Sequence, residues 1–385
     1  MWVFFIFIFV CTNMYGNFKV LFVTNKFPYE PRQYLNNQIE GFIDQGIEVT
    51  ILAHEKSNYS FTQDDYYNLE QKTYYTVLPL NKREYDILYY QFGGIGRKYI
   101  EQVNPLYIGK KVVCFRGADA TSELEEHPHK YDLLFKKADL ILVVCQHFKN
   151  RLIAYGCPPE KIYVHHSGID CNKFKFKERS STTDKNIRII SVGRLTKMKG
   201  FCFALKAIAK LVKIIPNLRY EIIGNGELFD KLQTMITDLG LRKNVFLRGQ
   251  LSHDEVITAL NNAHIFLLTS CTTKEGEQEG IPNVLMEALA SGLPVVATNH
   301  SGVPELIQDG ISGFLVPEKN VNKLVQKLKY LIQHSDLWIK FAKAGAQRVY
   351  KYHNKEIQNK KVLNIFKKLV NNEEIVIDDN YLNID

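Results

Sequence analysis

The chain has 385 residues, of which 45% are hydrophobic and 23% are charged, and its formal net charge at pH 7 is +8. This size and apolar content indicate a globular chain with two domains, each large enough to bury a core. The positive charge does not indicate nucleic-acid binding, because the sequence has no zinc-finger spacing, no aromatic ribonucleoprotein signature and no helix-turn-helix pattern.

Residues 1–16 form an apolar leader that begins MWVFFIFIFVC. The leader lacks a basic n-region, and its apolar run of about ten residues is too short to span a bilayer as a helix. Two interpretations stay open. The leader is a weak anchor or signal, or the natural start is Met14 and the leader is a mis-start.

Short apolar runs alternate with helical stretches in both halves of the chain. Near-continuous apolar runs are typical of parallel strands that are covered on both faces, so the pattern predicts an α/β fold. The predicted strands are residues 20–23, 49–52, 87–90, 112–115, 140–144 and 162–164, followed by 189–192, 220–223, 245–247, 265–268, 294–297 and 313–316.

A polar stretch, KFKERSSTTDKN at 175–186, divides this pattern in two, because it is rich in Ser and Thr and has no apolar period. We therefore predict a first domain at 17–175, a linker at 176–186 and a second domain at 187–349, with a cleft between the two. We also predict a closing helix at 350–370 and a poorly ordered acidic tail at 371–385.

The first motif of the second half is VGRLTKMKG, in which an apolar run ends at Gly193 and Arg194, Lys199 and Gly200 follow. Ligands of parallel sheets gather outside the carboxyl ends of the strands. Arg194 and Lys199 are therefore placed to neutralise a pyrophosphate leaving group. Taken alone, the same residues also fit a solvated basic turn.

Three further segments follow in order. In IIGNGEL, Gly224 and Gly226 come after another buried strand, but Phe229 stands where a dinucleotide-binding turn needs its third glycine, which argues against an oxidoreductase. The segment FLRGQLSHDE follows at 246–255. The wide loop TSCTTKEGEQ at 269–278 is placed to close over a ligand as a lid.

The segment EGIPNVLME begins at Glu279 and ends at Glu287. Gly280 frees the backbone, and Pro282 and Asn283 suit a helix start whose free N–H groups attract an anion such as a diphosphate. Glu279 then lies before the helix, where it can face a sugar ring, and Glu287 lies about one turn inside it, where it can accept from a ribose diol. Alone, the pair also fits a surface loop and an ordinary amphipathic helix.

The order and spacing of these motifs at 187–317 resemble the nucleotide-binding half of retaining glycosyltransferases of family 4. That family has the GT-B fold of two facing Rossmann-like domains. KVLFVTNKFPYEPRQYLNNQIEGFIDQGIEVTILA at 19–53 resembles the first unit of its colanic-acid and exopolysaccharide branch, and IYVHHSGIDCNKF at 162–174 resembles the segment before its linker. The resemblance covers residues 17–350.

The resemblance implies transfer with retention from a UDP- or GDP-sugar to a glycan or lipid-linked oligosaccharide, on the way to a surface polysaccharide. It places the closing helix against the first domain. It also implies a cytoplasmic enzyme that meets its acceptor at the inner face of the membrane. The implied contacts to the diphosphate of the donor are Arg194 and Lys199. Its sugar is contacted by Glu279, Gly280, Ile281, Pro282 and Asn283, and its ribose by Glu287. The turn of Gly224 and Gly226 is also expected at the donor site.

One departure from the family concerns the acceptor side. Many relatives carry a His followed by Gly and, two residues later, by Asp, whereas this chain has Arg116, Gly117, Ala118 and Asp119. Arg116 cannot act as a base, but it can hold a phosphate or a developing oxyanion, so activity can survive the exchange. The alternative is an inactive nucleotide-binding pseudoenzyme. Asp119 is a second candidate on the same side.

We expect neither a metal nor another cofactor, because the chain has no Asp-x-Asp triplet and Arg194, Lys199 and a helix terminus can neutralise the diphosphate. His165 and His166 are expected at the cleft rather than on a metal. A sugar-nucleotide epimerase is an alternative enzyme class, although it would lack the Glu279 to Glu287 segment. Anionic membrane contact is a further expectation for the lysines of the closing helix, at 355, 360, 361, 367 and 368.

Overall fold

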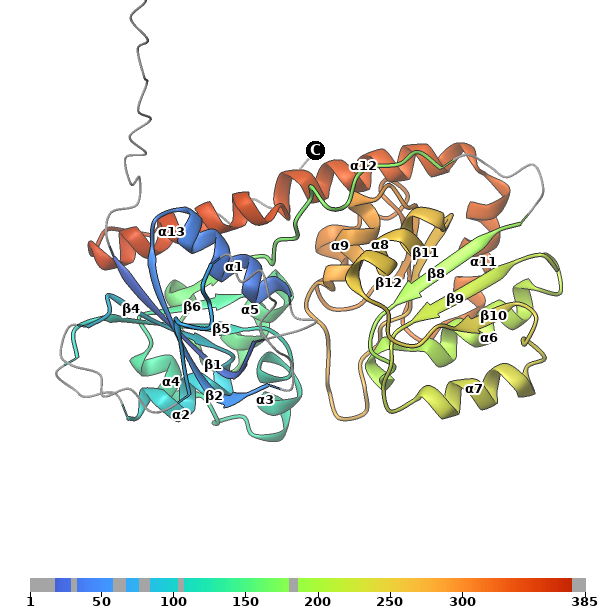
Figure 1. Cartoon of the computed structure of the whole chain (residues 1–385). Helices are drawn as coiled ribbons and strands as arrows, with labels where there is room; N and C mark the ends of the chain where they lie inside the picture. Colours follow the sequence, from blue (N-terminus) through green and yellow to red (C-terminus); the bar gives the residue numbers. More distant parts are fainter. Residues whose placement is uncertain are drawn as a thin grey trace, which may run out of the picture.

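The computed structural model describes residues 18–28, 33–57, 67–75, 84–102, 107–179 and 186–375. The predicted leader, residues 180–185 of the predicted linker and residues 376–385 of the predicted tail lie outside the described residues. The described chain forms two lobes, which lie side by side and are connected along one edge by the helices α12 and α13 (Figure 1).

A parallel sheet in the order β3-β2-β1-β4-β5-β6-β7 forms the centre of the first lobe. Six of its strands follow the predicted apolar runs. Only β3 was not predicted, because it has two residues and neither is buried. The strands are β1 (Lys19–Phe27), β2 (Glu48–Lys56), β3 (Thr73–Tyr74), β4 (Ile87–Gln91), β5 (Lys110–Phe115), β6 (Leu140–Val143) and β7 (Ile162–Val164).

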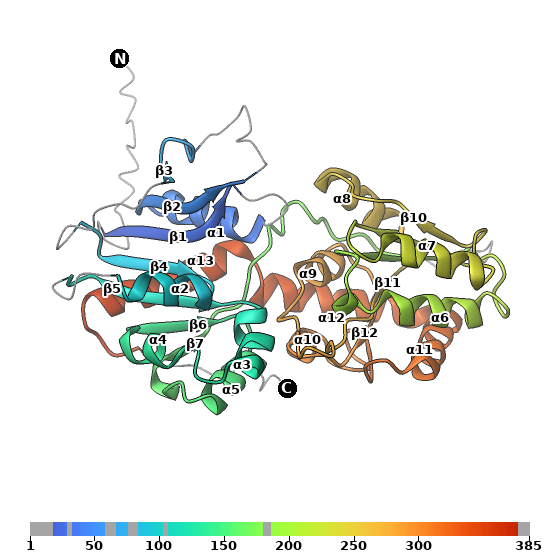
Figure 2. The same cartoon turned by 90° about the horizontal axis from the view of Figure 1, so that it is seen from below.

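Helices cover both faces of this sheet (Figure 2). They are α1 (Gln33–Asp44), α2 (Gly93–Ile100), α3 (Ser122–Glu126), α4 (Asp132–Lys137), α5 (Gln146–Ala154) and, from the end of the chain, α13 (Lys355–Val370). The ring of Phe366 on α13 lies 5.8 Å from that of Phe42 on α1 and 5.2 Å from that of Tyr89 on β4. The last helix thus belongs to the core of the first lobe.

The second lobe is built around the parallel sheet β10-β9-β8-β11-β12-β13, and all six strands follow predicted runs. The strands are β8 (Arg188–Val192), β9 (Arg219–Ile223), β10 (Val245–Leu247), β11 (Ile265–Leu268), β12 (Val295–Thr298) and β13 (Phe314–Val316). The helices are α6 (Phe201–Leu211), α7 (Phe229–Asp238), α8 (His253–Asn262), α9 (Asn283–Ala290), α10 (Val303–Leu306), α11 (Val321–Gln333) and α12 (Asp336–Tyr352).

Each sheet reverses its strand order once, between β1 and β4 in the first lobe and between β8 and β11 in the second. Ligands of doubly wound sheets bind outside the carboxyl ends of the strands at such a switch point. The loops after β8 and β11 carry Arg194, Lys199 and Glu279. The strand order therefore explains why motifs far apart in the sequence meet.

The closing helix begins later than predicted. Residues 350–352 still belong to α12, and α13 starts at Lys355 because the side chain of Asn354 caps it by accepting from the N–H of Glu356 at 2.8 Å. One lysine of the expected membrane face, Lys355, is engaged in an ion pair with Asp170 at 2.8 Å.

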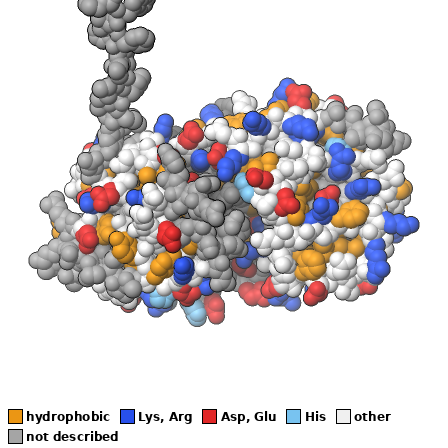
Figure 3. All heavy atoms as spheres, viewed as in Figure 1, with side chains coloured by type: hydrophobic (Ala, Val, Ile, Leu, Met, Phe, Trp, Pro, Cys, Tyr) orange, Lys and Arg blue, Asp and Glu red, His pale blue; other side chains and the backbone are white. Residues whose placement is uncertain are grey.

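Surface charge is mixed on the face of the molecule shown in Figure 3, where Lys and Arg side chains are interspersed with Asp and Glu. Such a distribution differs from the basic stripe of a nucleic-acid-binding surface. Within the described ranges, no helix combines the length and the apolar character that crossing a bilayer requires.

Candidate active site

A cleft of about 660 Å³ lies between the lobes, and both lobes contribute to its walls. Its volume is in the range of small-molecule sites. The first lobe contributes the loops after β4 and β5, and the second lobe contributes the loops after β8 and β11. Of the predicted site residues, the cleft is lined by Arg116, Asp119, Arg194, Lys199, Glu279, Gly280, Ile281, Pro282 and Asn283.

Gly224 and Gly226 are not among the residues that line the cleft, and their contact with a ligand stays a prediction. A Cβ atom on Gly224 would lie 2.0 Å from the carbonyl oxygen of Gly193, and one on Gly226 would lie 2.8 Å from the backbone of Leu195. Both glycines have positive φ angles, of 137° and 156°. Their role is to let the backbone pass close behind Arg194, and so to support the loop that carries it.

The segment at 246–255 also has a structural role. The side chain of Ser252 accepts from the N–H of Glu255, and the Glu255 carboxylate accepts from the N–H of Ser252 at 2.8 Å. This capping box starts α8, away from the cleft lining.

The segment 279–287 forms the helix start that the sequence predicts. Pro282 is the N-cap of α9, with φ −66° and ψ 127°, and the helix begins at Asn283. The free N–H groups of the first turn and the positive end of the helix dipole therefore lie at the cleft wall that residues 280–283 form.

Glu279 and Lys199 form a buried ion pair, with side chains exposed by only 7% and 12%. The second carboxylate oxygen of Glu279 accepts from the hydroxyl of Ser270 at 2.8 Å. Arg194, in contrast, is exposed and is not paired with a carboxylate in the described residues. Of the two predicted diphosphate cations, therefore, Lys199 is paired with a carboxylate and Arg194 is not paired with any described one.

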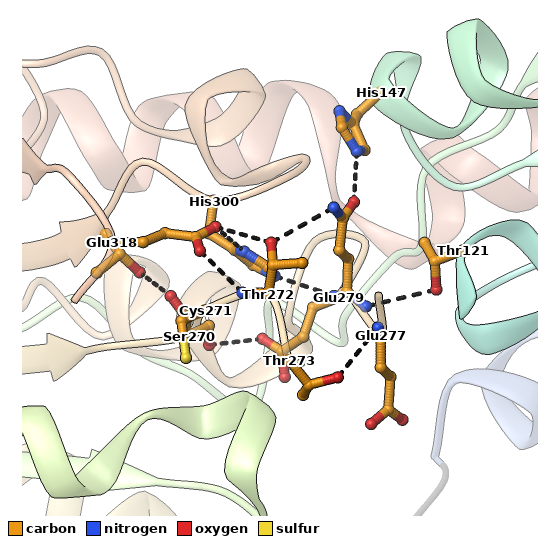
Figure 4. Close-up of polar contacts among 12 residues, drawn as sticks. Thr121, His147, Ser270, Cys271, Thr272, Thr273, Glu277, Glu279, His300 and Glu318 are labelled. Atoms are coloured by element: carbon orange, nitrogen blue, oxygen red, sulfur yellow. Dashed lines mark hydrogen bonds and ion pairs between the residues drawn. The ribbon is translucent and has the colours of Figure 1, made fainter. Parts of the chain in front are cut away.

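Two residues that the sequence did not single out, His300 and Glu318, position Glu279 (Figure 4). The backbone N–H of Glu279 donates to Nε2 of His300 at 3.1 Å, and Nδ1 of that ring donates to Glu318 at 2.5 Å. Glu318 also accepts from the N–H of Thr272 at 2.9 Å. His300 follows β12 and Glu318 follows β13, so the strand order brings both to the site. They form no recognisable sequence motif, which is why the sequence did not predict them.

Glu305 connects the two lobes, and the sequence analysis did not predict this role either. Its carboxylate comes from α10 of the second lobe and accepts from the backbone N–H groups of Gln146 at 2.9 Å and His147 at 3.0 Å, at the start of α5. The loop at 269–278 reaches the first lobe as well, because the Gln278 side chain contacts His147 at 2.6 Å. These contacts hold the lobes together around the cleft.

Glu287 is not among the residues that line the cleft; it is a half-buried residue of α9, one turn after Asn283, and its ribose contact stays a prediction. Burial raises the pKa of its carboxyl from 4.5 to about 7. A neighbouring diol that donates hydrogen bonds to the ionised carboxylate would favour the charged form.

Asp119 lines the cleft but is 4% exposed and engaged with the backbone. Its carboxylate accepts from the N–H groups of Gly93, Arg116 and Gly117, at 2.8, 3.0 and 2.8 Å. Three such bonds fix the loop after β5, so Asp119 is a positioning residue for Arg116.

His165 and His166 are buried rather than exposed to the cleft, which corrects the expectation for them. Each ring contacts a backbone carbonyl, of Gln358 and of Val144. Burial lowers the pKa of His165 to about 3 and that of His166 to about 4, so both stay neutral near pH 7. Among the residues described, no group of three or more His, Cys, Asp or Glu is arranged to hold a metal ion.

Comparison with known proteins gives matches over both lobes. The family model "Glycosyl transferases group 1" matches residues 172–348. Amylovoran biosynthesis glycosyltransferase AmsK of Erwinia amylovora is 33% identical, over 91% of this chain and 100% of the relative. Putative colanic acid biosynthesis glycosyltransferase WcaL of Escherichia coli is 31% identical, with the same coverage of 91% and 100%. The structure of HepE from Anabaena in complex with UDP matches with a TM-score of 0.74 at 18% identity, over 91% of this chain and 100% of that chain.

Proposed function

The chain belongs to the group 1 glycosyl transferases, and from this premise we propose that it moves a sugar from a nucleoside-diphosphate donor to a glycan hydroxyl in surface polysaccharide biosynthesis. Family membership confirms the predicted resemblance, and the match to HepE over both lobes confirms the predicted GT-B fold. The pathway is supported by AmsK and WcaL, whose names refer to amylovoran and colanic acid. The epimerase alternative gains no support from these relatives.

The main support for the proposed donor site is that several positive groups lie together at the switch point of the second sheet. Arg194, Lys199 and the start of α9 face the cleft from neighbouring strand ends. A diphosphate there would compete with Glu279 for Lys199, since each phosphate offers several acceptor oxygens to the same ammonium. Release of Glu279 would free its carboxylate for the hydroxyls of the sugar. Donor binding and exposure of the sugar-binding carboxylate are thus coupled.

In the proposed reaction the bond between the anomeric carbon and the phosphate oxygen breaks, and the acceptor oxygen bonds to that carbon with retention. The departing diphosphate oxygen takes the electron pair of the broken bond and accepts the hydroxyl proton of the acceptor. Arg194, Lys199 and the helix terminus stabilise that growing charge, so the reaction needs no divalent metal. The ribose diol would donate to Glu287.

The acceptor enters from the first lobe in this proposal. We infer a glycan or lipid-linked oligosaccharide, which the enzyme meets as a peripheral protein at the inner face of the cytoplasmic membrane. For the donor base we favour uracil over guanine, because the HepE structure contains UDP.

The test is calorimetric titration of the purified protein with UDP and with GDP, in chelator and without added metal. We expect UDP to bind, and Arg194→Ala and Glu287→Ala each to weaken it by about 10-fold, the loss of one charge-assisted hydrogen bond. Arg219→Ala is the matched control, because Arg219 is exposed at the opposite end of a strand of the same sheet. Binding of neither nucleotide would refute the donor site, and binding only with Mg²⁺ would refute metal independence.

A further inference from the structure

The first-lobe wall of the cleft carries a positive charge that the proposed donor site does not use. Among the described residues that line the cleft, the cations are Arg116, Arg194 and Lys199. Lys199 is paired with Glu279, and Arg194 lies on the donor side. Arg116 projects from the loop after β5, on the other lobe, and no described carboxylate pairs with its guanidinium.

The partners of the Arg116 side chain are all neutral. Nε donates to Gln91 Oε1 at 3.3 Å, Nη1 to Ser167 Oγ at 3.4 Å and Nη2 to Gln38 Oε1 at 3.4 Å. The guanidinium also lies 4.6 Å from the centre of the Tyr34 ring. Hydrogen bonds between a guanidinium and a carboxylate are shorter, about 2.7–2.9 Å. Arg116 is therefore oriented by its surroundings but its charge is not neutralised by them.

The acids on the same wall are already engaged. Asp119 accepts from three backbone N–H groups, including that of Arg116 itself. Glu123 accepts from Lys130 at 2.7 Å and from the hydroxyl of Tyr131 at 2.5 Å. Neither carboxylate turns toward the Arg116 guanidinium in these contacts.

A guanidinium keeps its charge at any physiological pH, and a partly buried charge is costly unless an opposite charge accompanies it. No described carboxylate pairs with the Arg116 guanidinium, although Glu277 and Glu279 line the opposite wall of the cleft, so an anionic ligand is a suitable partner for it. The guanidinium suits such a ligand because its planar fork binds a carboxylate or a phosphate with two parallel hydrogen bonds. The four residues that contact the guanidinium fix its orientation. All four belong to the first lobe: Tyr34 and Gln38 lie on α1, Gln91 on β4 and Ser167 after β7.

We propose that Arg116, with Gln38, Gln91, Ser167 and Tyr34, forms a subsite for a carboxylate or phosphate on the sugar substrate that lies against the first lobe. This inference rests on the proposed function and deepens it, because it makes an acidic sugar the preferred substrate. The anionic group has two possible sources. It belongs to the transferred sugar, as in a uronic-acid donor, or to the acceptor glycan.

The experiment compares acidic and neutral sugars on the full chain by calorimetry at low salt. The donor arm titrates UDP, UDP-glucose and UDP-glucuronate. The acceptor arm titrates methyl glucoside, methyl glucuronide and glucose 6-phosphate into protein saturated with UDP. The variants are Arg116→Gln, which keeps a hydrogen-bonding side chain without charge, and Arg116→Lys, which keeps the charge without the fork.

We expect an acidic sugar to bind at least about 10-fold more tightly than its neutral counterpart in one arm, which identifies the source of the charge. Arg116→Gln should abolish that preference and leave UDP affinity unchanged, and Arg116→Lys should retain part of it. Thermal melting confirms that each variant folds.

Two results would overturn the subsite. One is equal binding of acidic and neutral sugars in both arms, and the other is a loss of affinity for UDP itself in Arg116→Gln, which would assign the guanidinium to the diphosphate. Failure of the proposed function is distinguishable, because it appears as absent UDP binding in the unmodified protein. In that case the acceptor arm is run without nucleotide and still decides whether Arg116 selects an acidic sugar.

Discussion

At the scale of single residues, the cleft depends on side chains whose charges are only partly compensated. Lys199 and Glu279 compensate each other, whereas Arg194 and Arg116 face the cavity on opposite lobes. The negative charge of Glu287 has no such partner among the described residues; its raised pKa instead lets the carboxylate take up a proton and become neutral. Charges that are not fully compensated in the folded protein carry a cost in stability.

The cost at Glu287 depends on pH in a defined direction. The unfolded carboxyl has a pKa of 4.5 and the folded one a pKa of about 7, so the folded state holds the proton more tightly. Below pH 4.5 the carboxyl is protonated in both states and does not lower the stability of the fold. The destabilisation grows between pH 4.5 and pH 7 and has its full value above pH 7.

We therefore compare the melting temperature of Glu287→Gln with that of the unmodified protein at each pH. We expect this difference to be about 2–4 °C larger, in favour of the variant, at pH 8 than at pH 5. This figure corresponds to about 1 kcal/mol, less than the full shift in pKa, because the side chain is only half-buried. Scanning calorimetry of both proteins at the two pH values measures it. An offset that does not change with pH would mean that Glu287 is not protonated in the folded protein.

At the scale of elements, the close packing of α1 and α13 depends on one glycine. A Cβ atom on Gly41 would lie 1.8 Å from Nδ2 of Asn359, which donates to the carbonyl oxygen of Asn37 at 2.9 Å. Alanine is normally favoured over glycine inside a helix by about 1 kcal/mol. Here the tertiary contact should reverse that preference.

The prediction is that Gly41→Ala lowers stability by about 1–3 kcal/mol, because it displaces the Asn359 amide and breaks its hydrogen bond. The control is the double variant Gly41→Ala with Asn359→Ala, which removes the clash. Thermal unfolding of the two single variants and the double variant completes a mutant cycle. Additive effects in that cycle would show that the two residues do not interact.

At the scale of the whole molecule, Glu305 is a contact through which one lobe caps a helix of the other. A carboxylate at a helix N-terminus contributes about 1–2 kcal/mol, and both oxygens of Glu305 are used at the start of α5. Its loss should shift the protein toward an open cleft without unfolding either lobe.

We expect Glu305→Ala to increase the radius of gyration in small-angle scattering, with Glu305→Gln intermediate because one amide oxygen can still accept. Glu227→Ala is the matched control, since Glu227 is an exposed acid of the second lobe. An unchanged radius in Glu305→Ala would show that other contacts, such as that of Gln278 with His147, hold the cleft closed.

Much of this architecture is predictable from the sequence, because twelve strands are apolar runs and parallel strands bring their following loops to one edge. That reasoning predicted that Arg194, Lys199 and Glu279 lie close together, and all three line the cleft. It missed His300 and Glu305, because both act on backbone N–H groups of distant segments, and such contacts leave no spacing to read. It predicted a ligand contact for Gly224 and Gly226, and it could not show that a neighbouring backbone approaches both, because glycines with either role look alike in sequence.

The place of α13 has a consequence for synthesis. The first lobe begins with β1, but its core is complete only when Phe366 lies against Phe42 and Tyr89. On the ribosome, residues 186–352 of the second lobe therefore emerge as a folding unit before the first lobe receives its last helix. The nascent first lobe keeps an apolar face uncovered until residues 355–370 have been synthesised, and a chaperone would be needed during that interval.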